Sequence, residues 1–286
     1  MYTNLQLTNY TFTTTKISKT TSIVVISDSH NNFSSKWLSM IRSTNPSYIL
    51  IVGDLMLGRK LAGSDVCVRW SNLNTKSFEF LKSLLSIAPV YMSLGNHEAL
   101  ATSQDLCGIQ KMGVEVLDNS YVSLDEGIIL GGLTSGLVTC YRRYGEKRGI
   151  IEKIRGESHH EFYHHGESDF ELSEPDYQWG DTFERECGYK ILMSHHPEYW
   201  SLRNPKLIDR NIDLVLSGHA HGGQIRLFDR GLYSPGQGFL PEFTKGEYKG
   251  KNGVMIVGAG MANTYRIPRV FNPLELINIT IKSIRN

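Results

Sequence analysis

The sequence has few of the features that identify secreted, membrane-spanning or polyanion-binding proteins. Its four cysteines form no CxxC pair and no disulfide framework, which favours a reducing, cytoplasmic location. Residues 1–19 are rich in Thr and contain no apolar core, so we expect no signal peptide. The longest apolar stretch, residues 84–94, is broken by Ser86, Pro89 and Ser93 and is too short to span a bilayer.

An excess of one charge sign is also missing. The chain carries 30 Lys and Arg residues against 29 Asp and Glu residues, a formal net charge of +1. This balance argues against a polyanion held mainly by bulk charge, although a local basic patch is compatible with it. Repeats and low-complexity linkers are absent from the sequence as well. We therefore expect a single globular domain over residues 1–286, with an insertion-like segment at about 138–188 where periodicity is weak.

Apolar runs and amphipathic stretches alternate along most of the chain, which indicates an α/β fold. Strands are predicted at residues 5–18, 23–26, 48–52, 90–94, 189–194, 212–217, 254–257 and 274–281, with short strands within 113–133. Helices are predicted at residues 34–41 and 75–87, the second with Phe78, Leu81, Leu84 and Leu85 on its apolar face.

Five of the predicted strands end in polar clusters of residue types that bind metals. The clusters are Asp28 with His30, Asp54, Asn96 with His97, His195 with His196, and His219 with His221. Each cluster alone is compatible with an ordinary turn, or with exposed histidines. In α/β folds, however, sites form outside the carboxyl ends of strands, and neutral imidazole is a common metal ligand. Five separate strands that deliver such residues therefore favour one shared metal site.

These clusters lie in five motifs whose order and spacing resemble the calcineurin-like metallophosphoesterases. The motifs are DxH at 28–30, GD at 53–54, GNHE at 95–98, SHHP at 194–197 and GHAHGGQ at 218–224. The C-terminal half, with PGQG at 235–238 and FTKGEY at 243–248, is similar to the YkuE-type bacterial phosphoesterases. Those relatives often carry an N-terminal membrane segment, which is not expected here. The resemblance implies a four-layer α/β/β/α sandwich of the metallophosphoesterase type.

The resemblance also implies two divalent metal ions at one end of the sandwich. The ligands would be Asp28, His30 and His221 for the first ion, Asn96, His195 and His219 for the second, and Asp54 as the bridge between them. Mixed nitrogen and oxygen ligands suit Mn, Fe, Zn, Co or Ni better than Mg or Ca. The ligand types alone do not select one metal from this set.

Three further residues of the motifs would lie beside the ions. His97 would act as a proton donor or phosphate contact, and Glu98 could orient it, although a Glu in the first turn of a helix is equally expected. His196 would face the substrate or support the ligands, with a purely structural role as the alternative.

The hypothesis is therefore an enzyme, a dinuclear metal-dependent phosphoesterase. It would hydrolyse a phosphodiester or a phosphomonoester through a hydroxide that bridges the two ions. A nuclease and a lipid-linked pyrophosphatase of the same fold are alternatives, disfavoured by the near-neutral charge and by the missing membrane segment. A non-catalytic scaffold is a third alternative, disfavoured because every expected position is filled. The sequence predicts a phosphate-ester substrate as partner and does not predict an oligomeric state.

Overall fold

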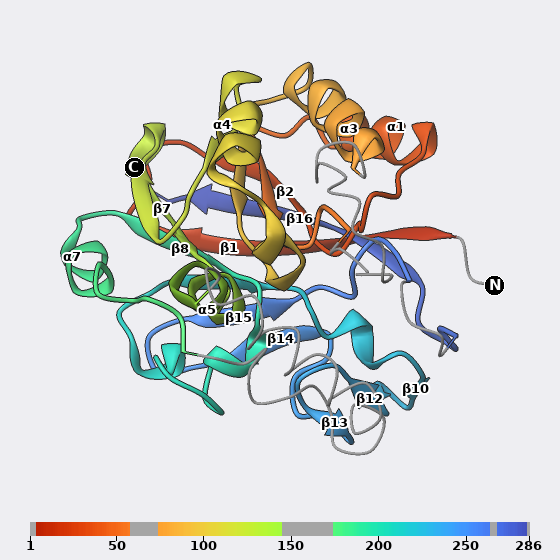
Figure 1. Cartoon of the computed structure of the whole chain (residues 1–286). Helices are drawn as coiled ribbons and strands as arrows, with labels where there is room; N and C mark the ends of the chain where they lie inside the picture. Colours follow the sequence, from red (N-terminus) through yellow and green to blue (C-terminus); the bar gives the residue numbers. More distant parts are fainter. Residues whose placement is uncertain (1–3, 58–73, 145–173, 264–267, 285–286) are drawn as a thin grey trace.

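Two six-stranded sheets form the framework of the protein (Figure 1). The computed structural model describes residues 4–57, 74–144, 174–263 and 268–284. The first sheet has the order β1 (Leu5–Thr14), β16 (Leu274–Ser283), β2 (Thr21–Ile26), β3 (Tyr48–Val52), β4 (Val90–Ser93) and β5 (Glu115–Val116). The second has the order β14 (Gly246–Lys249), β15 (Val254–Val257), β9 (Leu214–Ser217), β8 (Tyr189–Ser194), β7 (Ile128–Leu133) and β6 (Ser120–Ser123).

The central strands of both sheets are buried on both faces, and their sequences are apolar at successive positions. In β2, Ile23 and Val25 join the core between the two sheets, whereas Val24 and Ile26 join the core under the helices. This alternation is the two-residue period of a strand. The same division holds in β3, β8, β9 and β15, which explains why their sequences read as continuous apolar runs.

Helices cover the outer faces of the two sheets. The first sheet is covered by α1 (Ser35–Ser43), α3 (Thr75–Leu85) and α4 (Ser103–Lys111), which lie together at the top of Figure 1. The second is covered by the short α7 (Gly180–Arg185) and by the 3-10 turns η3 (Pro197–Tyr199) and η4 (Leu207–Asp209). The four-layer α/β/β/α prediction is therefore confirmed, with a fourth layer made mainly of single turns.

The apolar face predicted for the helix at residues 75–87 packs against the core, but the prediction omitted Phe80. Phe80 is fully buried in α3, while Phe78 is only partly buried. Ser77 takes the buried place one turn before Phe80 and Leu81, because its hydroxyl donates to the carbonyl oxygen of Leu55 at 3.0 Å. A polar residue that satisfies its hydrogen bond inside the core cannot be found from hydrophobic spacing.

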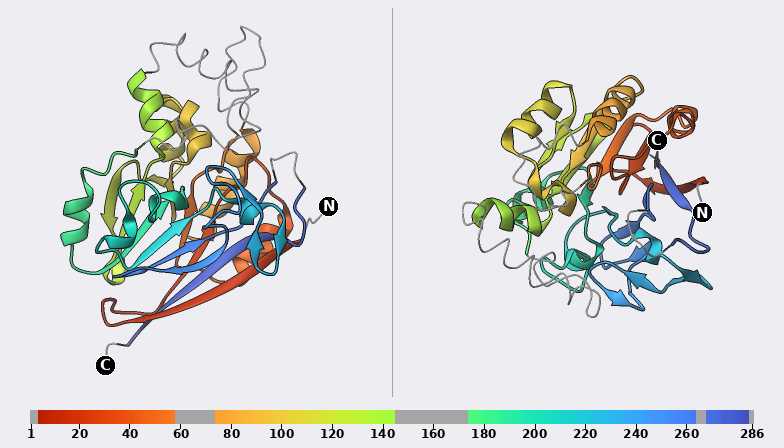
Figure 2. Two further views of the ribbon diagram at one scale, coloured as in Figure 1. Left: turned by 90° about the horizontal axis from the view of Figure 1, so that it is seen from below. Right: turned by 45° about the vertical axis from the view of Figure 1, so that its right-hand side comes forward.

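Parallel pairing brings the polar clusters to one edge of the sandwich. Strands β2, β3, β4 and β5 run parallel in the first sheet, and β7, β8, β9 and β15 run parallel in the second. Their carboxyl ends therefore face the same side. The predicted N-terminal edge strand is confirmed as β1, which pairs in parallel with β16 along its whole length, as Figures 1 and 2 show.

The remaining elements are short and lie in the connections. They are α5 (Gly136–Tyr144), η1 (Asn96–Leu100), η2 (Asp125–Gly127), η5 (His221–Gly223) and the hairpins β10 (Arg226–Leu227) with β11 (Arg230–Gly231) and β12 (Tyr233–Ser234) with β13 (Gly238–Phe239). The insertion-like segment predicted at 138–188 falls mostly on 145–173, outside the described residues, and its described ends form parts of α5 and α7. Within the described part of the chain, no helix is long and apolar enough to cross a membrane.

Candidate metal centre

The loops that follow β2, β3 and β9 hold the site residues in an unusual backbone conformation. Asp28, His30 and Asp54 have φ angles of 51°, 46° and 51°, and His219 and His221 have φ angles of 64° and 47°. Non-glycine residues rarely adopt positive φ, at a cost of about 1–3 kcal/mol each, and such residues cluster at functional sites. The left-handed turns end the strands abruptly, so that all three loops aim their side chains back at the sandwich edge.

Backbone hydrogen bonds lock these loops to one another. The amide of His30 donates to the carbonyl oxygen of Asp54 at 3.0 Å, which joins the loops after β2 and β3. The amide of Met261, after β15, donates to the carbonyl oxygen of Ser27 at 3.1 Å and so joins the two sheets. The positions of the side chains are therefore set by the framework rather than by free loops.

The first group of candidate ligands contains Asp28, His30 and His221, all buried. Their ligand atoms lie within 4.8 Å of one another. The Nε2 atoms of His30 and His221 face each other at 3.4 Å, and Asp28 Oδ1 lies 3.7 Å from Nε2 of His221. Two imidazole nitrogens and a carboxylate that converge in this way make a site for one cation.

The second group contains Asp54, His195 and His219. Nδ1 of His195 lies 2.7 Å from the carbonyl oxygen of Val52, so the ring donates there and turns its Nε2 toward Asp54 Oδ2, 3.1 Å away. A backbone carbonyl that fixes the tautomer in this manner is a common support of a metal-binding histidine. His195 Nε2 is also 3.8 Å from Asp28 Oδ1, so the two groups adjoin.

Several buried polar atoms of the site lack a hydrogen-bond partner in the described protein. They include Nδ1 of His30 and Oδ1 of Asn96. A buried polar atom without a partner costs roughly 1–3 kcal/mol. Asn96 is only 8% exposed, so water does not compensate its oxygen freely. Unpaired nitrogen and oxygen atoms around two carboxylates fit divalent cations, and these residues therefore match the group that the family motif implies.

The two carboxylates determine the charge state of the histidines. Burial lowers the pKa of His195, but Asp54 and Asp28 outweigh it and raise that pKa to about 10. Burial lowers the pKa of both His30 and His221 well below the usual range, with the neighbouring His97 adding to the effect on His30. Burial would raise the pKa of Asp54, yet His195 and His97 hold it well below its ordinary value. The carboxylates thus draw positive charge to the His195 position, which a proton or a metal cation can supply.

His97 differs from the other histidines of the site because it is partly open to solvent. Its side chain is 31% exposed, and its Nε2 lies 3.8 Å from Asp54 Oδ2. Its backbone amide donates to Asp54 Oδ1 at 2.9 Å, and its ring packs edge-on against His30 with centroids 4.4 Å apart. His97 also lies within reach of a cation shared with His30 and Asp54. Position alone therefore fits both a ligand and a group that meets the substrate.

Glu98 is occupied by backbone amides. One oxygen, Oε2, accepts from the amides of Asp54 at 2.8 Å and Gly95 at 2.9 Å, and Oε1 accepts from Met56 at 3.1 Å. Burial, with the nearby Asp54 as the next cause, raises the pKa of Glu98 to about 7. The carboxylate ties the GD and GNHE loops together, a function that differs from the expected orientation of His97 and that spacing alone could not reveal.

His196 is fully buried, and its ring lies against the ligand histidines. Its Nε2 is 2.8 Å from Oγ of Ser135, its Nδ1 is 3.8 Å from Oε2 of Glu198, and its ring centroid is 4.3 Å from that of His219. Burial, with His219 and His195 as further causes, lowers its pKa well below the usual range. The neutral ring thus packs behind the second group of ligands.

Two residues of the site neighbourhood escaped sequence reasoning. Arg269 is 5% exposed and places Nη2 at 3.2 Å from Nδ1 of His221 and at 2.6 Å from the carbonyl oxygen of Ala262. Glu198 is 1% exposed, and its carboxylate forms a further candidate group with His196 and His219. Burial raises its pKa. Arg269 lies 48 positions from His221 and in no motif, so only the fold brings it there.

The family model of the calcineurin-like phosphoesterases matches residues 21–223. The chain belongs to this family. A protein of Aquifex aeolicus (strain VF5) named as an uncharacterized metallophosphoesterase is 23% identical over 301 residues, which cover 99% of this chain and 94% of that protein. The chain is thus a metal-dependent phosphoric ester hydrolase. The particular similarity to YkuE-type phosphoesterases stays a prediction.

Solved structures of related folds are more distant from this phosphoesterase. A candidate 5′-nucleotidase from Staphylococcus aureus in complex with α-ketoglutarate is 13% identical with a TM-score of 0.47, over 94% of this chain and 55% of that chain. The sulfate thiohydrolase SoxB of Thermus thermophilus in complex with glycerol is 13% identical with a TM-score of 0.45, over 87% of this chain and 41% of that chain. The phosphoesterase chain therefore spans about half the length of these two structures or less.

Proposed function

We propose that this phosphoesterase binds two divalent ions, one in each group of ligands. Asp28, His30 and His221 would hold the first ion, and Asn96, His195 and His219 the second. The observation that carries the proposal is the position of Asp54, whose carboxylate belongs both to a group with His30 and to a group with His195 and His219. A carboxylate that reaches two adjoining groups is suited to bridge two cations.

The ligand set favours borderline metals such as Mn, Fe, Zn, Co or Ni, since it mixes imidazole nitrogens with carboxylate and amide oxygens. When bound, two such ions supply Lewis-acid stabilisation of the phosphate and a nucleophile formed from water near neutral pH. The protein's own contribution is to fix the ligands before the substrate arrives. Left-handed loops and cross-loop hydrogen bonds hold Asp28 and Asp54 in place, so little reorganisation is needed during the reaction.

His97 is proposed as the acid that protonates the leaving oxygen. Its amide is anchored on Asp54, while its imidazole is the partly exposed one and can meet a substrate. A histidine beside cations can give its proton to the leaving alkoxide and regain it from water. His196 is proposed as a support of His219, and Glu98 as a support of the loops that carry Asp54 and Asn96.

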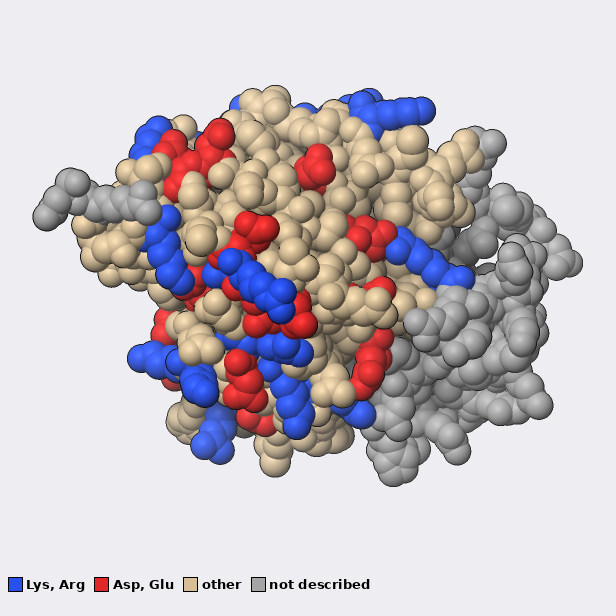
Figure 3. All heavy atoms as spheres, turned by 90° about the vertical axis from the view of Figure 1, so that its left-hand side faces the viewer, with Lys and Arg blue, Asp and Glu red and all other residues tan. Residues whose placement is uncertain are grey.

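The proposed substrate is a phosphodiester or phosphomonoester of a small alcohol. A nuclease is disfavoured, because the near-zero net charge supplies little general attraction for a polyanion. Figure 3 agrees on the face it shows, where Lys and Arg side chains alternate with Asp and Glu side chains.

A reducing, cytoplasmic location is proposed from the cysteines. Cys107 and Cys187 are both free and exposed, and exposed thiols persist best where glutathione keeps them reduced. Cell fractionation followed by immunodetection tests this, and recovery in a secreted fraction would contradict it.

The central test of the function compares metal-stripped protein before and after addition of Mn, Ni, Zn or Mg. Hydrolysis of p-nitrophenyl phosphate and of bis(p-nitrophenyl) phosphate would be followed for the wild type and for Asp54→Asn. We expect turnover to need added metal, and Asp54→Asn to lower kcat by at least about 100-fold, because the bridging charge is lost. The matched control is Asp125→Asn, an exposed carboxylate in η2. Normal rates in Asp54→Asn would exclude the two-ion assignment.

The role of His97 has its own test. His97→Ala should keep both metal ions and lose rate on alkyl esters by about 10²–10⁴-fold, the usual contribution of a general acid. The loss should be much smaller with p-nitrophenolate as leaving group, since it needs no proton. Metal content is measured alongside the rates. If His97→Ala instead loses an ion, the residue is a ligand rather than an acid.

A further inference from the structure

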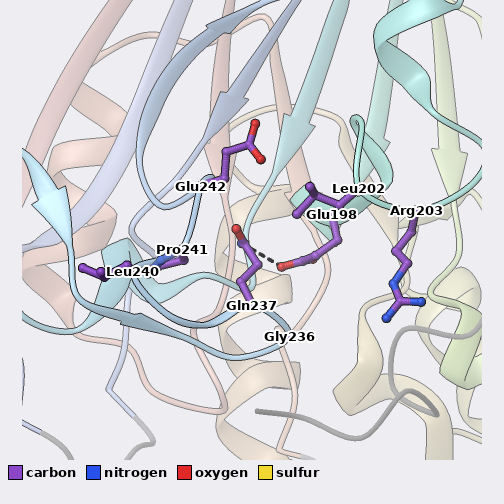
Figure 4. A pocket seen from close by; sticks show the side chains of 8 residues that line it. All are labelled: Glu198, Leu202, Arg203, Gly236, Gln237, Leu240, Pro241 and Glu242. Carbon is purple, nitrogen blue, oxygen red and sulfur yellow. Dashed lines mark hydrogen bonds between the residues drawn. The ribbon is translucent and has the colours of Figure 1, made fainter. Parts of the chain in front are cut away.

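A surface cavity, whose lining residues are drawn in Figure 4, includes Glu198, a neighbour of the second group of ligands. Its volume is about 380 Å³, and its lining includes Glu198, Gln237, Leu202, Arg203 and Glu242. Glu198 forms the link to the metal centre, because its carboxylate lies within 4.8 Å of the ligand atoms of His196 and His219. The cavity therefore adjoins the metal centre at Glu198.

The cavity wall at Glu198 is rigid. Oε1 of Glu198 accepts a hydrogen bond from Nε2 of Gln237 at 2.8 Å, drawn as the dashed line in Figure 4. Gln237 is held in turn by Phe243, whose carbonyl oxygen accepts at 2.8 Å and whose amide donates at 2.9 Å. Oε2 of Glu198, fully buried, has no hydrogen-bond partner among the described residues. The loop at 235–243 is thus fixed against the site by buried polar contacts.

The lining combines charge with apolar surface. Glu242 supplies a hydrogen-bond acceptor, and Arg203 supplies a donor on the other side of the cavity in Figure 4. Leu202, which is 46% exposed, and Leu240, which is 74% exposed, offer apolar faces at the rim. A site with few convergent polar groups and some apolar wall suits a small polar organic group, because it can pair the hydrogen bonds and cover a ring.

The cavity and the proposed acid adjoin different groups of ligands. His97 lies against His30, in the first group, whereas Glu198 lies against His219, in the second. During hydrolysis the leaving oxygen must be close to His97 to receive its proton. The side of the phosphate that faces the cavity is therefore not the leaving side, and only the other ester substituent can extend into it.

We propose that the cavity binds the ester substituent that stays on phosphorus, so that the substrate is a phosphodiester whose retained part is a polar group of nucleoside or sugar size. This inference rests on the function proposed above and deepens it. Water adds to phosphorus, the bond from phosphorus to the leaving oxygen breaks, and the leaving alkoxide takes a proton from His97, which a proton released by the attacking water replaces. The products are one alcohol and one phosphomonoester, whose remaining substituent occupies the cavity.

The test compares three substrates that release the same p-nitrophenolate. They are p-nitrophenyl phosphate, which has no second substituent, the p-nitrophenyl ester of thymidine 5′-phosphate, and p-nitrophenyl phosphorylcholine, which offers no N–H or O–H donor. With Mn-loaded wild-type protein, we expect kcat/KM to be at least about tenfold higher for the thymidine ester than for the choline ester, within the usual range for one recognised group.

Leu202→Trp, which fills the rim of the cavity, should lower the ratio of kcat/KM for the thymidine ester over the monoester by about tenfold. The matched control is Ile284→Trp, at an exposed position next to Thr14 and outside the cavity lining, and its ratio should equal that of the wild type. The smaller change Leu202→Phe, with a thermal melt of each variant, guards against misfolding.

Three results would overturn the inference. An unchanged ratio in Leu202→Trp would mean that the cavity does not meet the substrate. If Leu202→Trp lowered kcat/KM by the same factor for the thymidine ester and the choline ester, this would contradict the polar class of the substituent. Failure of metal-loaded wild type to hydrolyse any of the three substrates would refute the proposed function itself, a result distinct from a change of ratio alone.

Discussion

His195 is the residue on which the charge balance of the site depends most. Its Nδ1 is committed to Val52, so only Nε2 can take a proton or a metal ion, and Asp54 lies 3.1 Å from that atom. Asp54 and Asp28 raise the pKa of His195 to about 10 against the opposing effect of burial. At neutral pH the metal-free protein therefore carries a proton where the second ion is proposed to bind.

Metal binding at the second group should consequently release that proton. Lower pH favours protonated His195, so metal affinity should fall as pH falls, by up to about tenfold per pH unit below pH 10. Titration calorimetry of the metal-free protein in two buffers of different ionisation enthalpy measures the release. We expect about one proton per second ion bound near pH 7.5. Identical heats in both buffers would show that His195 is neutral before the metal binds.

Most single residues of the site were predictable from the sequence, since five short motifs place Asp, Asn and His after five apolar strands. The supporting residues were not. Glu98 was known from its motif, but its three backbone partners lie up to 44 positions away and depend on how two loops meet. Glu198 and Arg269 act through neighbours in space, and no local pattern marks such contacts.

At the scale of elements, the loops after β3 and β4 behave as one unit. Gly95 packs so closely on Asp54 that an added Cβ would overlap the carboxylate. Glu98 closes the same unit through the amides of Asp54, Met56 and Gly95. The position of Asp54 thus depends on the absence of a side chain at Gly95 and on the buried carboxylate of Glu98.

Gly95→Ala should displace the Asp54 carboxylate and reduce metal content and kcat strongly, even though Gly95 has an ordinary backbone conformation with φ −84°. The matched control is Gly108→Ala, in α4, where no atom lies within 4 Å of the added Cβ. The control should gain roughly 0.5–1 kcal/mol of unfolding free energy, because Ala is the better helix residue. Urea unfolding and metal analysis of both variants decide the matter. A fully active Gly95→Ala would contradict the close approach.

Glu98→Gln should leave at least one backbone amide without an acceptor, because the new NH2 group can only donate. We expect a loss of about 1–3 kcal/mol of unfolding free energy and a 10–100-fold weaker metal affinity at pH 8, where the carboxylate of the wild type is ionised. Glu79→Gln, at an exposed position on α3, is the control and should change neither quantity. If Glu98→Gln and Glu79→Gln had the same unfolding free energy and the same metal affinity, Glu98 would not support the metal-binding loops.

For the whole molecule, the core between the two sheets carries stability while the edge carries the site. Ile279 of β16 is fully buried in that core and pairs with Ile23 of β2. Fold class and layer order were predictable, because buried strands read as apolar runs. The thin outer layer of the second sheet was not, because turns such as η3 and η4 have no periodicity to detect.

Ile279→Ala should lower the unfolding free energy by about 2–5 kcal/mol while metal content and kcat stay close to those of the wild type. Ile284→Ala, at a position 55% exposed, should change stability little. Denaturant unfolding and the p-nitrophenyl assay give both readouts. A large loss of metal in Ile279→Ala at a temperature where it remains folded would mean that the edge is not independent of the core.

The central claim, two ions that share Asp54, is tested most directly by anomalous diffraction from crystals of the Mn-loaded protein. We expect two peaks, one among Asp28, His30 and His221 and one among Asn96, His195 and His219, each next to the Asp54 carboxylate. A single peak in that space, or peaks that lie away from Asp54, would contradict it.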